Sequence, residues 1–179
     1  EAERTQTVDQ FALAALRLLT FLGARRGEIL NLKWEDVHFE NSFLYLPDSK
    51  TGKKEVYLNA PAKELLSNLP KVKSNPYVIV GRIKGRPLVD LKGPWNRIRK
   101  DAQLEGLRIH DLRHSFASMG AKGGVPLKIL SNLLGHSSIE MTERYSHLAD
   151  DPVHNASDVI GNQIQAIMNP EKEDVEIID

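Results

Sequence analysis

The spacing of apolar residues is helical along most of this chain and changes to the spacing of strands around residues 43–58. Residues 8–22 carry large apolar side chains at roughly helical spacing until Gly23 interrupts the pattern. Residues 43–46 and 55–58 are strand-like, and the lysine-rich stretch between them contains Gly52, which is typical of a hairpin connection. We therefore expect an α+β domain that is mostly helical and has a small antiparallel sheet.

The same pattern predicts several shorter elements, many of them bounded by glycine or proline. A further strand is expected over residues 77–80, and the pattern is helical again from Leu88 onward. Other helices are expected over residues 25–33, 61–69, 111–121, 126–134 and 139–148. A last amphipathic helix is expected over residues 158–168, with its isoleucines on one face.

Length and composition exclude several classes of protein. The 179 residues are 41% hydrophobic and 27% charged, which suits one soluble globular domain. The apolar runs are too short for a helix that spans a bilayer, and we see no secretory signal. Because cysteine is absent, the sequence excludes disulfides, thiol nucleophiles and cysteine-ligated metals. We expect a cytoplasmic protein that does not associate with membranes.

The formal net charge is zero, but the charges are unevenly distributed. Residues 50–113 contain 15 Lys and Arg against 6 Asp and Glu, whereas residues 170–179 contain one Lys against five acidic residues. The basic stretch is either an ordinary solvated surface or a face that binds phosphate groups, and charge alone does not decide between them. We expect the acidic end to be a solvated, mobile tail.

Three clusters of chemically capable residues stand at predicted helix ends. Residues 23–29 include an arginine pair, residues 110–116 begin with His-Asp-Leu-Arg-His, and residues 134–147 contain two histidines and a tyrosine. Helix N-termini attract anions through their free N–H groups. Each cluster alone has an ordinary structural explanation, such as an Arg25–Glu28 surface pair. Together they describe a binding site for one phosphate group with a phenol beside it.

A zinc hydrolase is an alternative, because His110 and His114 are four residues apart on a predicted helix. The zinc-protease motif requires Glu directly after the first histidine, whereas this chain has Asp111, and a third ligand would also be needed. A third possibility is a DNA-binding module without catalytic activity, which would not require a tyrosine at the site.

The clusters resemble, in the same order, the catalytic domain of tyrosine recombinases, the phage integrase and Xer-like family. Residues 20–37 resemble the first arginine box of that family, and residues 49–53 resemble the hairpin that carries its lysine. Residues 110–117 are similar to the second box and residues 133–147 to the third. The resemblance extends over about residues 8–150.

The resemblance implies six catalytic residues. They are Arg25, Lys50, His110, Arg113, His136 and the nucleophile Tyr145. Glu28 and Asp111 are expected to orient the arginines or His110 as supporting acids. We choose Arg25 rather than Arg26 from its position relative to the Gly-Glu pair, while Lys53 and Lys54 remain alternatives to Lys50.

The family chemistry is phosphoryl transfer without a metal or another cofactor. The tyrosine attacks a DNA phosphate and forms a 3′-phosphotyrosine, and the 5′-hydroxyl leaves. Two guanidinium groups would stabilise the charge of the transition state, and Lys50 would protonate the leaving oxygen. His110 would accept the tyrosine proton or bind a phosphate oxygen, and His136 would add a donor.

The resemblance also implies an organisation and partners. We assign residues 1–169 to the catalytic domain and residues 170–179 to the acidic tail, and the N-terminal DNA-binding domain typical of the family is missing from this chain. The partners would be double-stranded DNA and three further protomers, with the last amphipathic helix either docked on a neighbour or packed on its own domain. Among functions, we favour a mobile-element integrase over an Xer-like chromosome-resolution recombinase, and both over a type IB topoisomerase.

Overall fold

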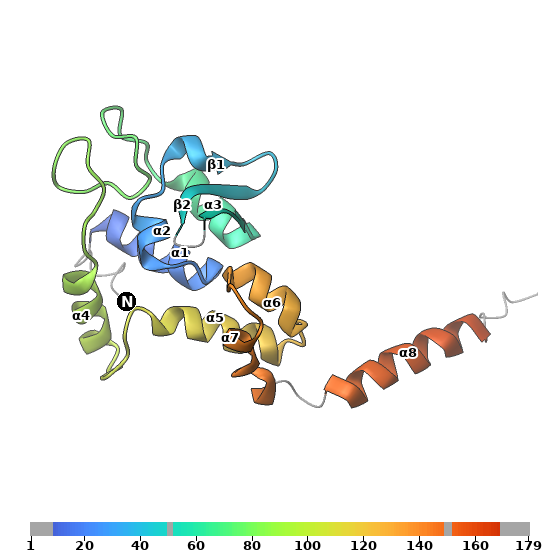
Figure 1. The fold of residues 1–179 in the computed structure, drawn as a ribbon. Coiled ribbons are helices and arrows are strands. Elements are labelled where there is room, and N and C mark those ends of the chain that lie inside the picture. Colours follow the sequence, from blue (N-terminus) through green and yellow to red (C-terminus); the bar gives the residue numbers. More distant parts are fainter. Residues whose placement is uncertain (1–8, 50–51, 149–151, 169–179) are drawn as a thin grey trace, which may run out of the picture.

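Figure 1 shows the fold in a computed structural model, which describes residues 9–49, 52–148 and 152–168. The chain begins with α1 (Gln10–Leu22), which is the most buried helix of the molecule's first half. The Asp9 carboxylate caps this helix by accepting hydrogen bonds from the Phe11 and Ala12 amides. Gly23 ends it with φ of 59°, a left-handed conformation that suits glycine.

The next segment turns sharply through α2 (Arg26–Leu30) and the short 3-10 helix η1 (Trp34–Asp36). The helix predicted over residues 25–33 therefore ends earlier, at Leu30. Leu32 lies outside the helix, and its carbonyl accepts a hydrogen bond from the Val78 amide. The strand predicted over residues 77–80 is absent, because that stretch makes only isolated bridges at Tyr77 and Val80.

A three-stranded antiparallel sheet follows, in the order β1–β2–β3. Its strands are β1 (Val37–His38), which the sequence pattern missed, β2 (Phe43–Ser49) and β3 (Gly52–Tyr57). Leu44 pairs with Val56 and both are buried, so side chains two residues from Val56 on β3 share its inward face. Lys54 is one of them, and this places it toward the helices. The expected mostly helical α+β fold with a small antiparallel sheet is thus confirmed.

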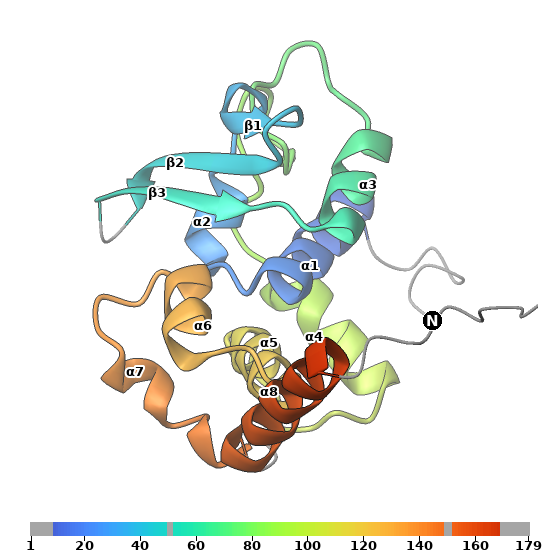
Figure 2. The same ribbon diagram turned by 90° about the vertical axis from the view of Figure 1, so that its right-hand side faces the viewer.

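Figure 2 shows the remaining helices of the body of the molecule. They are α3 (Ala60–Asn68), beside the sheet, and then α4 (Lys92–Asp101), α5 (Asp111–Lys122), α6 (Leu127–Leu134) and α7 (Glu140–Glu143). In Figure 2 the sheet lies at one end, α5, α6 and α7 lie at the other, and α1 and α2 lie between them.

Two hydrophobic clusters correspond to these two ends. The larger one joins α1 and α2 to the sheet, α3 and the Trp95 side chain of α4. The smaller one consists of Ala117 and Ala121 of α5, Leu130 and Leu134 of α6, and Tyr145. Gly23 lies where they meet, since a Cβ there would stand 2.5 Å from the Phe116 ring.

The last part of the chain departs from the predicted pattern. The helix expected over residues 139–148 divides into α7 and the 3-10 helix η2 (Ser146–Leu148), with Tyr145 between them. This turn directs the Tyr145 ring into the smaller cluster. The final helix, α8 (Pro152–Met168), begins earlier than expected and extends away from the body in Figure 1. Within the described residues, no helix is long and apolar enough to cross a membrane.

Candidate active site

The C-terminal end of α6 is where residues from distant parts of the chain converge. Gly135 ends this helix in a left-handed conformation, with φ of 63°. The Leu134 carbonyl accepts hydrogen bonds from Arg113 and Lys54, and the Gly135 carbonyl accepts one from Arg25. A helix C-terminus carries partial negative charge, so it attracts cations. Three cationic side chains from separate segments thus meet at two consecutive carbonyl groups.

Arg113 links the two hydrophobic clusters. Its guanidinium donates to the Gly23 carbonyl at 2.6 Å and to the Leu134 carbonyl at 2.7 Å. The residue is only 6% exposed although it lies in the first turn of α5. Burial lowers the pKa of Arg113, and the charge of Arg25 lowers it further. The two guanidinium groups donate to consecutive carbonyls, and a bound anion would relieve the repulsion between them.

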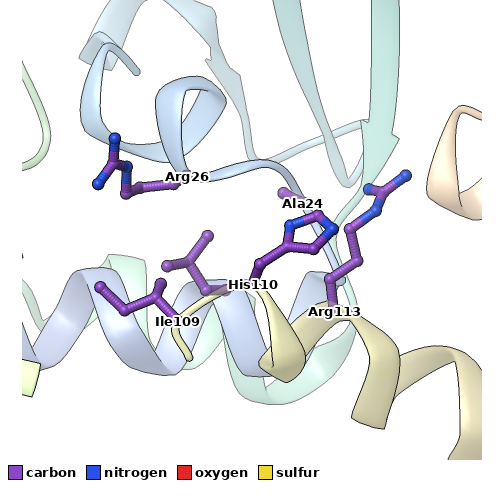
Figure 3. A pocket seen from close by; sticks show the side chains of 6 residues that line it. Ala24, Arg26, Ile109, His110 and Arg113 are labelled. Atoms are coloured by element: carbon purple, nitrogen blue, oxygen red, sulfur yellow. The ribbon is translucent and has the colours of Figure 1, made fainter. Parts of the chain in front are cut away.

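Arg25 is held at the site by its own helix start. Glu28 accepts hydrogen bonds from the Arg25 backbone amide at 2.8 Å and from its guanidinium at 3.0 Å. The other end of the guanidinium reaches Gly135 at 3.0 Å. Arg26 lines the same cavity as His110 and Arg113, but its guanidinium points away from Arg113 in Figure 3 and pairs with Asp90. The structure therefore brings Arg25, and not Arg26, to the end of α6.

Lys54 is the hairpin lysine whose position at the site is described. Its ammonium lies 3.3 Å from the Glu28 carboxylate and 3.3 Å from the Leu134 carbonyl. Burial lowers the pKa of Lys54, and the charges of Arg113 and Arg25 add to this effect, while Glu28 opposes it. The predicted Lys50 lies outside the described residues. The alternation along β3 is the sequence signal that could have identified Lys54, because it shares a face with Val56 and Leu58.

His110 stands at the start of α5 and lines a cavity of about 180 Å³ together with Arg113 and Ala24. Figure 3 shows the His110 ring and the Arg113 side chain on the same side of α5. Partial burial lowers the pKa of His110, and His114 and Arg113 lower it further. A neutral imidazole, able to donate at one nitrogen and accept at the other, is therefore favoured beside Arg113.

Asp111, which the resemblance gives as a supporting acid, is hydrogen-bonded to Arg108 in this structure. Its carboxylate accepts hydrogen bonds from the Arg108 side chain, at 2.8 Å, and from the Arg108 amide, also at 2.8 Å. These bonds lower the pKa of Asp111 to about 2. Asp111 thus pairs with Arg108, and its charge raises the pKa of His110, against the effects that lower it.

His136 follows Gly135 directly and faces the same group of cations. Its Nδ1 lies 2.7 Å from the hydroxyl of the buried Thr142. Burial lowers the pKa of His136 to about 4, and Arg113, Arg25 and Lys54 contribute to the shift. The ring is therefore neutral at pH 7. If Nδ1 accepts the Thr142 proton, Nε2 carries the ring hydrogen and is a donor.

Tyr145 is 6% exposed, and its hydroxyl is hydrogen-bonded to His114 Nδ1 at 2.5 Å. Burial raises the pKa of Tyr145, although the charges of Arg144 and Arg113 act in the opposite direction. From the sequence, His114 was interpreted as a packed or solvated side chain or as a zinc ligand, and no catalytic role was predicted for it. Its helical spacing to Ala117 and Ala121 indicates the same inward face.

This arrangement suits an anion with a single centre of negative charge. Arg25, Arg113 and Lys54 supply cationic donors, His110 and His136 supply neutral imidazoles, and Glu28 is the carboxylate that hydrogen-bonds the cations. Among the described residues, no group of three His, Cys, Asp or Glu side chains could hold a metal ion. The third ligand that a zinc site needs is therefore not found in that part of the chain.

Comparisons with known proteins identify the family. The model of the phage integrase family matches residues 2–151 of the chain. The tyrosine recombinase XerA of Pyrococcus horikoshii is 34% identical over 149 residues, which is 79% of this chain and 52% of that protein. The chain thus spans about half the length of this curated relative.

Solved structures give the same result for the fold. The catalytic domain of bacteriophage HP1 integrase superimposes with a TM-score of 0.62 at 26% identity, covering 89% of this chain and 84% of that one. XerH site-specific recombinase, bound to a palindromic difH substrate in a post-cleavage complex, has a TM-score of 0.67 at 24% identity. That match covers 89% of this chain and 50% of XerH.

Proposed function

Since the chain belongs to the phage integrase family of tyrosine recombinases, we propose that it cleaves and rejoins DNA strands at specific sites through a 3′-phosphotyrosine intermediate. The observation that carries this proposal is the convergence of Arg25, Arg113 and Lys54 at the end of α6. A scissile phosphate bound there would meet fixed cations, and the segment with Tyr145 follows a few residues later. The DNA-bound XerH structure, which has the same fold, supports a DNA substrate.

In the proposed reaction, Tyr145 Oη attacks the phosphorus and the bond to the 5′-oxygen breaks. The two guanidinium groups stabilise the charge that develops on the non-bridging oxygens. One preorganised donor of this kind typically accounts for about 10²–10³ in rate. Neutral His136 donates a further hydrogen bond to the phosphate, and His110 binds a phosphate oxygen beside Arg113. No metal is required.

The leaving 5′-oxygen needs a proton, because an alkoxide is a poor leaving group in water. We assign this role to Lys50, which the hairpin between β2 and β3 would bring to the phosphate when DNA binds. Lys54 is the competing candidate, since it is already at the site and its lowered pKa favours proton donation. A 5′-bridging phosphorothiolate, whose sulfur leaves without protonation, distinguishes them. It should restore cleavage in Lys50→Ala and not in Lys54→Ala.

A covalent-trapping experiment tests the proposal. The protein is incubated with a pool of nicked duplexes of random sequence, with EDTA present, and covalent protein–DNA adducts are isolated and sequenced. We expect adducts with the wild-type protein and none with Tyr145→Phe. Tyr57→Phe is the matched control, because Tyr57 is 65% exposed and lies on the face of β3 opposite Lys54. An equal yield of adducts from Tyr145→Phe would refute the proposed nucleophile.

The biological role within the family is also a proposal. We favour a mobile-element integrase, in line with the basic stretch of residues 50–113, and the likeness to HP1 integrase supports it. The identity to XerA favours an Xer-like resolution recombinase as the alternative. Mapping the trapped DNA separates them, because an integrase site lies at the end of an inserted element. Relaxation of plasmids that lack the site would instead indicate a topoisomerase.

The proposed recombination joins two duplexes and therefore requires four protomers on DNA. The exposed apolar face of α8, with Ile160 and Ile164, supports docking on a neighbouring protomer. We also propose residues 1–169 as the catalytic domain, with residues 170–179 as an acidic extension outside it. A DNA substrate is in keeping with the cytoplasmic location expected from the sequence. Light scattering of DNA complexes, with and without Ile160→Asp and Ile164→Asp, tests the tetramer.

A further inference from the structure

His114 is the side chain that meets the reactive oxygen of Tyr145. Its Nδ1 lies 2.5 Å from the phenol oxygen, and the two ring centroids are 6.1 Å apart. His114 follows Arg113 on α5 and is partly buried. It is not among the six catalytic residues that the family resemblance implies, so the established motif leaves this contact without a role.

The surroundings of His114 hold its ring in place. It lies on the face of α5 that also carries the buried Ala117 and Ala121, next to the smaller hydrophobic cluster. The His110 ring meets it edge-on, with centroids 5.0 Å apart and planes at 89°. Because the His110 ring and the smaller cluster lie next to the His114 ring, its Nδ1 contacts the phenol without a rearrangement of the side chain.

A phenol that attacks phosphorus must lose its proton, and His114 is the imidazole that contacts the phenol. The His110 ring contacts His114 instead and binds a phosphate oxygen in the proposed reaction. Arg113 and Arg144 carry no lone pair for the proton. His136 is hydrogen-bonded to Thr142, and its pKa of about 4 makes it a weak base. Burial raises the pKa of Tyr145, so the resting phenol retains its proton until an acceptor takes it.

We propose that His114 Nδ1 accepts the phenol proton when Tyr145 Oη attacks the scissile phosphate. This inference rests on the function proposed above. In the step the Oη–phosphorus bond forms, the bond from phosphorus to the 5′-oxygen breaks, and the phenol proton moves to Nδ1. The 5′-oxygen receives its proton from the lysine acid, so charge and atoms balance. In rejoining, the imidazolium returns the proton to Tyr145.

The protonation of the His114 ring tests the inference without any catalysis. For Nδ1 to accept the proton, the neutral ring must carry its hydrogen on Nε2. Nitrogen-15 NMR of histidine-labelled protein at pH 8.5 should show this tautomer for His114. The Nδ1 resonance should shift in Tyr145→Phe. A ring with its hydrogen on Nδ1 would donate to the phenol oxygen, and this result would overturn the proposal.

A kinetic experiment tests the consequence for cleavage. The substrate is the duplex recovered by covalent trapping, made with a 5′-bridging phosphorothiolate so that no general acid is needed. His114→Asn retains a hydrogen-bonding group near the position of Nδ1 but accepts no proton, and His114→Phe retains a ring without an acceptor. We expect both variants to form the adduct about 100-fold more slowly, as for general-base catalysis.

The controls separate this inference from the function on which it rests. His147→Asn changes an exposed histidine close to Tyr145 in sequence and should leave the rate unchanged. Melting temperatures identify any variant that fails to fold, and the tautomer measurement then decides. Adduct formation by His114→Asn at the wild-type rate would refute proton transfer to His114 while the recombinase function stands. An absence of adducts from the wild-type protein would refute both.

Discussion

Replacing Glu28 by Gln removes the carboxylate that lies between the cations of the site and preserves the shape of the side chain. The Glu28 side chain is 5% exposed and accepts hydrogen bonds from the Arg25 guanidinium and the Lys54 ammonium. Gln keeps the hydrogen bond from the Arg25 amide, which starts α2. The change therefore tests the charge alone, since Arg25, Lys54 and Arg113 would repel one another without it.

The size of the effect follows from these contacts. A hydrogen bond to a charged group contributes about 1.5–3 kcal/mol, and removal of one member of a buried ion pair costs about 3–5 kcal/mol. Glu28 pairs with Lys54, which is also buried, and with Arg25, which is partly exposed. Because one hydrogen bond survives, we expect the Glu28→Gln variant to lose about 3 kcal/mol of unfolding free energy.

Urea denaturation followed by the fluorescence of Trp34 and Trp95 measures this loss, because urea adds no ions. Glu64→Gln on the exposed side of α3 is the matched control and should change stability by less than about 0.5 kcal/mol. Sulfate should restore part of the lost stability, because an anion at the site replaces the missing charge, and sodium chloride of equal ionic strength should restore less. A loss below about 1 kcal/mol would refute the reasoning.

The pH dependence has a definite sign. Burial alone raises the pKa of Glu28, but the hydrogen bond from the Arg25 amide and the charge of Lys54 outweigh it, and the pKa is lowered. A lowered pKa means that the carboxylate contributes stability above its ordinary pKa of about 4.3 and that this contribution is lost as the pH falls. As the pH falls below about 5, the unfolding free energy of the Glu28→Gln variant should therefore decrease less than that of the wild type.

Three further predictions concern the same region. Gly23→Ala should destabilise the protein by about 2 kcal/mol or more, because the alanine would have to adopt a positive φ and its Cβ would clash with Phe116. Gly27→Ala should cost nothing, because no atom lies within 4 Å of a Cβ there. Thermal unfolding compares the two variants. The pKa of His136 is about 4, below its ordinary value of about 6.5, so its neutral form contributes stability that decreases as the pH falls from 6.5 to 4; His136→Gln should flatten the melting temperature over this range. Lys54→Met should slow adduct formation about 10²-fold or more by removing a cation from the site, and a rate within threefold of the wild type would contradict the role of Lys54 as a resident cation.

The sequence predicts the elements whose signals are local. The periodicity of residues 8–22 and the two strand-like runs led to α1 and the hairpin, and Gly135 marked the end of α6. The family boxes led to the family, which the comparisons confirm. The interruption at Tyr145 was missed, because the helical spacing of residues 139–148 continues through a turn that tertiary packing imposes.

The candidate site was predictable in its residue types but not in its contacts. Backbone carbonyls have no sequence signature. Nothing in the sequence therefore indicates that the carbonyls of Leu134 and Gly135 accept hydrogen bonds from the cationic side chains of the site. The pairing of Asp111 with Arg108 was missed. Arg108 is three residues before Asp111, but the sequence also allowed His110 as the partner of Asp111. Lys54 and His114 could have been identified by following the inward faces of β3 and α5.

The cations of the site are anchored on peptide groups, and a peptide carbonyl neither ionises near neutral pH nor disappears when a side chain is exchanged. Substitutions of Leu134 should therefore leave the hydrogen bonds of Arg25 and Arg113 intact as long as α6 ends at the same residue. One inserted or deleted residue within α6 would instead rotate its last turn by about 100°. Both acceptors would then face away, so the length of this helix, more than its composition, determines whether the chain can bind a phosphate there.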